Sequence, residues 1–255
     1  LAAGHPAAAL RATTRSEASA TALSEETGVE AKAAGEDASA NAWAVEGADV
    51  VVLGVKPVGI AELARQIAPQ LRPDTVVLSV AAAITLATLE AALPAGQPVV
   101  RTMPNTPLQV GAGAVGLSRG TSADDDAVAR ATAVFGSSGQ VFEVPESQID
   151  AVSAVSGSGP AYAFYLAEAM ADGGVALGLD RELAVKLAAA TVAGAGRMLE
   201  QEGVDPAALR RAVTSPNGTT ERAIAVFDAR GVREAIAEGE KAATDRATQL
   251  SVELA

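Results

Sequence analysis

The sequence predicts an α/β fold over roughly the first 145 residues and an all-α fold over roughly the last 110. Short β-branched runs alternate with helical patterns as far as Val144, which indicates a mostly parallel sheet covered by helices on both faces. After Pro145 the strand patterns stop and long helical stretches follow. We therefore place an α/β domain at residues 1–145 and a helical domain at residues 146–255.

The predicted strands are short and rich in valine, as buried strands usually are. The run at residues 48–55 is continuously apolar, which predicts a strand buried on both faces. Apolar spacing of three and four predicts helices over residues 60–71 and 86–93, and Asp124–Asp126 are typical of the acidic first turn of another helix. The strands are predicted at residues 10–14, 48–55, 74–81, 98–103, 113–118 and 140–144.

Capping residues mark the helices of the second half. Asp180 and Asp205 are N-cap residues, and Pro206 suits the first position of a helix. The helices are predicted at residues 158–179, from Asp180 to about 202, from Asp205 onward, from the TSPNGTT segment to Gly231, and from Val232 to about 253.

Composition excludes several classes of function. The chain has no cysteine and one histidine, which rules out thiolate chemistry, disulfides and histidine-rich metal clusters, and we expect no metal site. The net charge is −12, from 19 basic and 31 acidic residues, which argues against nucleic acid or an anionic membrane as partner. No run approaches the ~18 apolar residues of a membrane helix. The first residues, LAAGHP, are typical of the end of a helix, so we expect the natural N-terminus to lie upstream.

Polar segments follow the predicted strands, where ligands bind in a doubly wound sheet. Lys56 comes directly after the most hydrophobic strand and would point into the ligand crevice, although it could equally be a surface lysine. In MPNTP, residues 103–107, prolines on both sides of Asn105 and Thr106 fix a polar loop that suits a ligand. The alternative there is an ordinary turn.

Arg15 lies between Thr14 and Ser16, at the end of the first predicted strand. At the end of the second strand of a nucleotide-binding sheet, an arginine accommodates the 2′-phosphate of NADP, and an acidic residue indicates NAD. Arg15 fits NADP, Glu17 weakens that interpretation, and a solvated charge is the alternative. The glycine-rich fingerprint belongs about twenty residues earlier, so its absence does not bear on the fold.

The TSPNGTT segment, residues 214–220, is a polar turn that runs into a helix. Gly218 permits a backbone conformation that other residues avoid. The first turn of the helix presents unpaired N–H groups, to which Ser215, Thr219 and Thr220 add hydroxyls. We predict that this turn holds a small anion without a basic side chain. The alternative is that the threonines only cap their own helix.

Together these segments resemble the pyrroline-5-carboxylate reductases. The matching stretches are VKP at 55–57, RTMPNTP at 101–107, VSGSGPAYAFYLAEAMADGGV at 155–175 and TSPNGTTERAI at 214–224. They keep their order and spacing over nearly the whole chain. The resemblance implies reduction of the cyclic imine of pyrroline-5-carboxylate to L-proline, the last step of proline biosynthesis, with NADPH preferred or NADH. It also implies a cytoplasmic enzyme with an N-terminal Rossmann domain and a helical domain that forms dimers and often decamers.

The same resemblance implies roles for individual residues. Thr220 would lie near the imine nitrogen, while Ser215, Gly218 and Thr219 would hold the substrate carboxylate. Two positions depart from the family, because Ala83 and Asn217 stand where the family has glycine. The residues implied to bind the cofactor are Thr14, Arg15, Ser16, Asn41, Val55, Lys56, Pro57, Ala81, Ala82, Met103, Pro104 and Asn105.

Two other functions remain open from the sequence. One is a related NADP-dependent oxidoreductase of the same architecture, acting on another imine or on a 2-hydroxy acid. The 2-hydroxy acid version usually needs a catalytic lysine in the helical half, where Lys186 and Lys241 lie outside any polar motif. The other is a non-catalytic cofactor-binding protein, which would not need the TSPNGTT turn and the MPNTP loop together.

Overall fold

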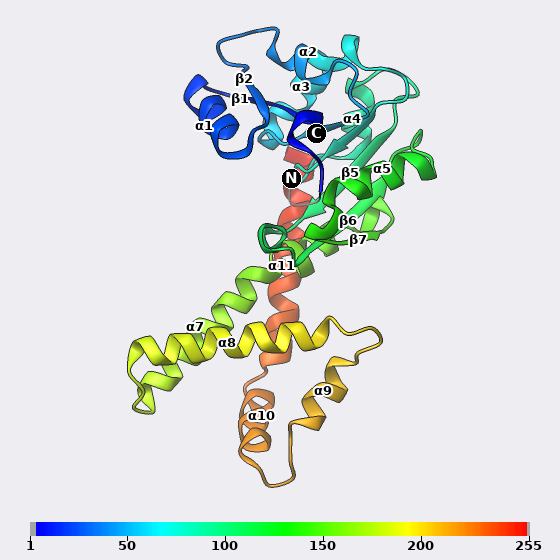
Figure 1. Ribbon diagram of the computed structural model, residues 1–255. Helices are drawn as coiled ribbons and strands as arrows, with labels where there is room; N and C mark the ends of the chain where they lie inside the picture. Colours follow the sequence, from blue (N-terminus) through cyan, green and yellow to red (C-terminus); the bar gives the residue numbers. More distant parts are fainter. Residues whose placement is uncertain (1–3, 254–255) are drawn as a thin grey trace. The chain divides into compact units, whose positions relative to one another are not determined.

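The computed structural model describes residues 4–253, which form two compact units (Figure 1). The first unit comprises Leu1–Gly157 and Ala243–Ala255, and the second comprises Ser158–Ala242. The first is α/β and the second is helical, as the sequence predicts. The division predicted between residues 145 and 146 stays a prediction.

The first unit contains a small parallel sheet and a larger mixed one. In the small sheet, β1 (Arg11–Thr14) pairs in parallel with β2 (Glu30–Ala33). The larger sheet has the order β3-β4-β5-β6-β7, and only β5 and β6 run antiparallel among its described neighbours. Its strands are β3 (Val50–Leu53), β4 (Val76–Ser79), β5 (Val99–Pro104), β6 (Gly113–Arg119) and β7 (Gly139–Glu143).

Helices cover both faces of the larger sheet. Alternate residues of β4 point to opposite faces, so Val77 packs with the cluster of α3 and α4, while Val76 and Leu78 pack with α5. All four β4 residues are buried, which confirms the predicted two-sided core. The helices of this unit are α1 (Glu17–Thr27), α2 (Ala40–Val45), α3 (Ile60–Ile67), α4 (Leu86–Ala92), α5 (Asp125–Phe135) and α6 (Ile149–Val152).

β3 departs from the prediction that its strand is buried on both faces. Val52 is 48% exposed, because β3 is an edge strand of the larger sheet. It faces a groove of about 790 Å³ that residues of β1 and β3 line. Three further elements, α1, α2 and β2, are not predicted from the sequence. The β2 sequence EAKA has no apolar alternation, and pairing with β1 defines it as a strand.

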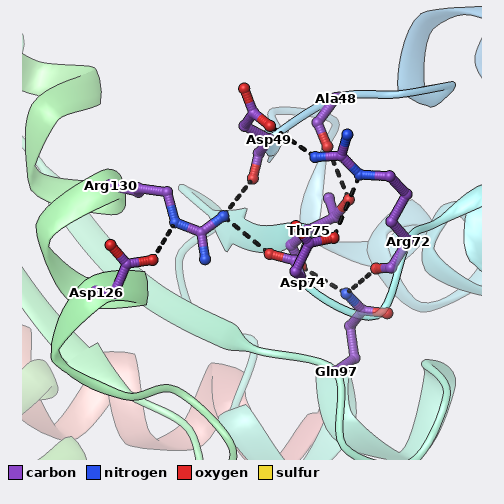
Figure 2. Close-up of polar contacts among 8 residues, drawn as sticks. All are labelled: Ala48, Asp49, Arg72, Asp74, Thr75, Gln97, Asp126 and Arg130. Atoms are coloured by element: carbon purple, nitrogen blue, oxygen red, sulfur yellow. Dashed lines mark hydrogen bonds and ion pairs between the residues drawn. The ribbon is translucent and has the colours of Figure 1, made fainter.

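Polar side chains fasten the loops at the amino end of β4 (Figure 2). Arg130 of α5 donates to the carbonyl oxygens of Asp49, at 3.3 Å, and Asp74, at 2.9 Å. Gln97 is 5% exposed, and its Nε2 donates to the carbonyl oxygen of Thr75 at 2.5 Å. These bonds join the segments that precede β3, β4 and β5, and so they fix this end of the sheet.

The second unit is built from helices whose starts follow the predicted caps. The Asp180 carboxylate accepts from the N–H of Leu183 at 3.0 Å, and that of Asp205 accepts from the N–H of Ala207 at 2.9 Å. No described helix is long and apolar enough to cross a membrane. The helices are α7 (Gly159–Ala176), α8 (Arg181–Leu199), α9 (Pro206–Ala212), α10 (Thr219–Ala229) and α11 (Val232–Glu253), whose last turns belong to the first unit.

The buried core of the second unit is small for its size. Within the described part of the chain, its buried apolar cluster consists of Ala171, Ala184 and Ala188, with Ala167 packed against it. Large apolar side chains are exposed instead, and an exposed apolar surface of this kind indicates a protein–protein interface. Those exposed by about half or more include Phe164, Tyr165, Leu166, Leu177, Leu187, Met198, Phe227 and Ile236.

Candidate active site

The carboxyl ends of β3, β4 and β5 lie side by side at one edge of the larger sheet. Leu53 of β3 is in register with Ser79 of β4, and Ser79 is in register with Arg101 of β5. Of the segments predicted to bind a cofactor, residues 55–57 and 81–82 come just after β3 and β4, and residues 103–105 comprise the last two residues of β5 and the one after it. The topology therefore brings three predicted segments to the edge where ligands bind in α/β sheets.

Lys56 offers a positive charge at this edge. Its side chain is exposed and makes no ion pair with any described residue, while its carbonyl oxygen accepts from Gly59 N at 2.9 Å. Pro57 then starts a short 3-10 helix, Pro57–Gly59, and Val55 is 45% exposed. The ammonium group is thus available to an anionic ligand.

The turn after β4 contains a strained residue. Ala81 is buried, and its N–H donates to Ser79 Oγ at 3.3 Å, whereas Ala82 is exposed. Ala83 follows with φ 66°, in the left-handed region that costs a non-glycine residue roughly 1–2 kcal/mol. The backbone itself therefore favours glycine at this departure from the family sequence.

Both polar atoms of the Asn105 side chain form hydrogen bonds within the protein. Its Oδ1 accepts from Ala114 N at 2.9 Å, and its Nδ2 donates to the carbonyl oxygen of Ser156 at 3.1 Å. Met103 and Pro104 are half-buried, and a Cβ at Gly157 would lie 2.7 Å from the Met103 methyl group. Asn105 therefore ties β6 to the π-helical turn Ser153–Gly157, and the segment after it forms a 3-10 helix, Thr106–Val110.

The TTRS segment presents one free charge beside two internally bonded hydroxyls. Thr14 Oγ1 donates to the carbonyl oxygen of Ser16 at 3.0 Å, and Ser16 caps α1 by accepting from Ser19 N at 3.4 Å. Arg15 is exposed and has no side-chain partner among the described residues. Of the three predicted phosphate ligands, the arginine is thus the one whose side chain is free to bind an external anion.

Asn41 is also engaged by neighbouring side chains. Its Oδ1 accepts from Thr13 Oγ1 at 2.8 Å, and its Nδ2 donates to Gln66 Oε1 at 3.0 Å. These bonds connect α2 to β1 and α3. The structure therefore gives Asn41 a role in holding these elements in place.

The TSPNGTT segment forms a tight turn, but Gly218 is needed for a different reason from the predicted one. Gly218 N donates to Ser215 O at 2.9 Å, and Asn217 has φ 59°, as the third residue of a type II turn requires. Gly218 itself has an ordinary extended backbone, with φ −80°, so the expectation of an unusual conformation there was wrong. A Cβ at this position would lie 2.9 Å from Ser215 O, so glycine is required for space.

The first turn of α10 is open to a ligand. Its N-cap, Gly218, has no side chain to cap the helix, and Glu221 bends back to accept from Asn217 N at 2.8 Å. The N–H groups and hydroxyls of Thr219 and Thr220 have no partner among the described residues. The hydroxyls thus do not cap their own helix, and the donors are left for an anion.

Glu36 lies beside the TTRS segment and was missed in the sequence. Its Oε1 accepts from Glu17 N, the first residue of α1, at 3.2 Å. The signal that could have revealed it is the Gly35-Glu36 pair shortly after a strand, but β2 itself lacks a strand-like pattern.

Comparisons with known proteins place the chain among reductases. Residues 146–250 match the family model for pyrroline-5-carboxylate reductase dimerisation, and residues 1–83 match that for NADP oxidoreductase, coenzyme F420-dependent. Pyrroline-5-carboxylate reductase of Pseudomonas aeruginosa is 45% identical over 229 residues, which cover 88% of this chain and 84% of that protein.

Solved structures agree with these matches. A pyrroline-5-carboxylate reductase from Coxiella burnetii superposes with a TM-score of 0.86 at 38% identity, over 94% of this chain and 87% of that one. The Plasmodium falciparum pyrroline carboxylate reductase with NADP bound has a TM-score of 0.78 at 22% identity, over 95% of this chain and 97% of that one, which shows a shared fold.

Proposed function

The chain belongs to the pyrroline-5-carboxylate reductase family, and we propose that the turn at Ser215–Thr220 holds the carboxylate of its substrate. The enzyme reduces the C=N bond of pyrroline-5-carboxylate to give L-proline, the last step of proline biosynthesis, with a nicotinamide cofactor. Its architecture is a Rossmann-type domain followed by a helical dimerisation domain. The observation that carries the proposal is the uncapped first turn of α10.

The carboxylate fits this turn by charge and by geometry. The N–H groups of Thr219 and Thr220 lie at the positive end of the α10 dipole, and no described side chain satisfies them. Gly218 lets the turn close tightly, because a Cβ there would lie 2.9 Å from Ser215 O, and the Ser215 hydroxyl adds a donor. An anionic substrate can therefore bind here without a basic side chain.

The Thr220 hydroxyl is proposed to bond the substrate nitrogen. The second helical residue can turn its hydroxyl toward a ligand held at the same helix end, and it has no competing partner among the described residues. A hydroxyl is a weak acid, so it stabilises the developing amine as a hydrogen-bonding group. We assign Thr220 the catalytic position and Ser215, Gly218 and Thr219 the carboxylate.

The edge of the larger sheet fits the cofactor. A bound reduced nicotinamide supplies the hydride that the imine carbon accepts. Residues 55–57, 81–82 and 103–105 lie at adjacent strand ends and shape that edge, where exposed Lys56 can face the cofactor phosphates. Positioning of this kind can supply ~7–11 kcal/mol of a reaction barrier, so no metal or nucleophile is required.

NADPH is proposed as the preferred cofactor, with NADH as the alternative. The exposed, unpaired Arg15 beside Thr14 and Ser16 supports binding of the 2′-phosphate. The Plasmodium falciparum reductase of the same fold binds NADP. Asn41 and its Thr13 partner would support the adenosine side of the site from within the protein.

The assembly follows from the helical half. The chain carries the family's dimerisation domain at residues 146–250 and forms a dimer with it. The exposed aromatic residues Phe164 and Tyr165 support burial against a partner subunit. We propose further assembly toward a decamer and a cytoplasmic location, and the net charge of −12 supports the absence of nucleic-acid and anionic-membrane partners.

A steady-state assay tests the proposed function. The full-length protein is given pyrroline-5-carboxylate with NADPH or NADH, and loss of reduced-nicotinamide absorbance is followed together with proline formation. Turnover with a higher kcat/KM for NADPH is expected. A folded protein that binds cofactor without turnover would instead support a cofactor-binding function.

A further inference from the structure

Glu36 places a negative charge at the point where α1 begins. The loop after β2 carries Glu36 back toward β1, and its Oε1 accepts from Glu17 N at 3.2 Å. Helix N-termini attract anions, so this carboxylate occupies one of the donors that a phosphate would otherwise use. The neighbouring hydroxyl of Ser16 already caps Ser19 N.

The backbone next to Glu36 is held tightly against the Arg15 segment. Gly35 N donates to Arg15 O at 3.2 Å, and a Cβ at Gly35 would lie only 2.3 Å from that oxygen. Only glycine fits such a close approach, and Glu36 N is in turn bonded to Ala33 O at 3.2 Å. The position of Glu36 beside residues 15–17 is therefore built into the loop.

No described cation neutralises Glu36. Neither Glu36 nor Arg15 forms an ion pair with any residue in 4–253, and Glu17 adds a second carboxylate to the same segment. Lys32 on the adjacent strand instead lies 4.2 Å from the centre of the Trp43 ring. The segment thus combines one positive side chain, Arg15, with two negative ones, Glu17 and Glu36. The interpretation of Arg15 as a ligand of the 2′-phosphate considers only the positive charge.

We propose that Glu36 is a specificity-determining residue, which opposes the 2′-phosphate of NADPH and accepts a hydrogen bond from the ribose hydroxyl of NADH. The proposal rests on the proposed function, because it takes the TTRS segment as the site of the adenosine ribose. A carboxylate that accepts from the ribose 2′-hydroxyl is typical of NAD sites, and an arginine is typical of NADP sites. The chain has both an arginine and a carboxylate at this position, so it uses both cofactors. Its preference for NADPH over NADH is smaller than it would be with Arg15 and without Glu36.

The test compares the binding of NADP⁺ and NAD⁺ to the full-length protein by calorimetry, together with kcat/KM for NADPH and NADH. Glu36→Gln keeps an oxygen to accept from Glu17 N and removes the charge, so the fold is expected to survive. The NADPH:NADH preference should rise about tenfold in Glu36→Gln at low salt and fall in Arg15→Ala. The shift in Glu36→Gln should shrink as salt is added.

The control is Glu25→Gln, which removes the same charge from an exposed position two turns along α1. It should leave the cofactor preference unchanged, and an equal shift in both variants would overturn the proposal. An unchanged ratio in Glu36→Gln would also overturn it. Glu36→Ala, which lacks any acceptor, should raise the ratio as well and serves if Glu36→Gln does not fold.

The binding data separate this proposal from the proposed function. The protein could bind both nucleotides without reducing pyrroline-5-carboxylate. If Glu36→Gln then shifted the ratio of the two affinities, the specificity role of Glu36 would stand and the proposed function alone would fail. Normal turnover with an unshifted ratio would remove the specificity role alone. A full-length protein that binds neither nucleotide would overturn both.

Discussion

Asn105 and Ser156 are joined by a hydrogen bond of 3.1 Å, from the Asn105 amide to the Ser156 carbonyl oxygen. The same amide accepts from Ala114 N, so one side chain fixes the loop after β5, the strand β6 and the π-helical turn Ser153–Gly157. π-helical turns recur at functional sites. The MPNTP loop is thus shaped by a link to the segment that leads into α7.

Replacement of Asn105 should lower activity through the shape of this loop. Asn105→Asp keeps the acceptor for Ala114 N but turns the donor toward Ser156 O into a second acceptor. We expect a loss of roughly tenfold or more in kcat/KM, and a cost of about 1–3 kcal/mol in unfolding free energy. Kinetics and urea unfolding measure the two effects, with exposed Thr106→Ala as the control. Wild-type values for both quantities would contradict the structural role of Asn105.

The positive φ of Asn217 predicts a difference between two small replacements. Asn217→Gly should stay within about 0.5 kcal/mol of wild type, because glycine and asparagine both tolerate the left-handed region. Asn217→Ala should destabilise the protein by about 1 kcal/mol, since alanine does not. Thermal unfolding of both variants measures this difference. Equal stability of the two variants would mean that the turn does not impose this conformation.

The Thr220 hydroxyl predicts a graded kinetic series. Thr220→Ala should lower kcat/KM by about one to two orders of magnitude, since one transition-state hydrogen bond is typically worth ~1–3 kcal/mol. Thr220→Ser keeps the hydroxyl and should retain most activity. Steady-state kinetics with pyrroline-5-carboxylate tests the series. Equal activity of the alanine and serine variants would remove the hydroxyl from the mechanism.

Glu143 predicts a contribution to stability that depends on pH. The hydrogen bond from Arg119 lowers the pKa of Glu143 below its ordinary value. The ion pair therefore stabilises the fold at neutral pH and is lost as pH falls through that lowered pKa. Both side chains are partly exposed, so Glu143→Gln should cost under about 1 kcal/mol at pH 7, and less in acid. Urea unfolding at neutral and acidic pH measures the difference, and a gap that widens in acid would contradict the sign.

The order of most strands and helices could be predicted from the sequence, because the signals that define these elements are local. Valine-rich strands such as Val76–Ser79 carry a strong local signal, and Asp180 and Asp205 cap helices through bonds within one turn. β2 could not be predicted, because its EAKA sequence becomes a strand only through pairing with β1. Val52 is exposed because its strand lies at a sheet edge, which no local pattern reveals.

The sequence predicted which segments form the site, but not the hydrogen bonds that its side chains make. Proline, glycine and hydroxyl patterns located the MPNTP loop and the TSPNGTT turn. The resemblance to the family marked Ala83 and Asn217 as positions where glycine is usual, and both have a positive φ. The partners of Asn105 and Asn41 are far away in the sequence, so only the folded chain shows that both amides are occupied. Glu36 was missed for the same reason, because its bond to Glu17 N joins the loop after β2 to the start of α1, 19 residues earlier.

The most direct test of the carboxylate-binding turn compares pyrroline-5-carboxylate with 1-pyrroline, the same imine without its carboxylate, in wild type and in Gly218→Ala. The added methyl group would lie 2.9 Å from Ser215 O and disturb the turn. We predict that Gly218→Ala lowers kcat/KM for pyrroline-5-carboxylate at least about tenfold more than it lowers kcat/KM for the slower reduction of 1-pyrroline. An equal loss with both substrates would contradict the claim that this turn binds the carboxylate.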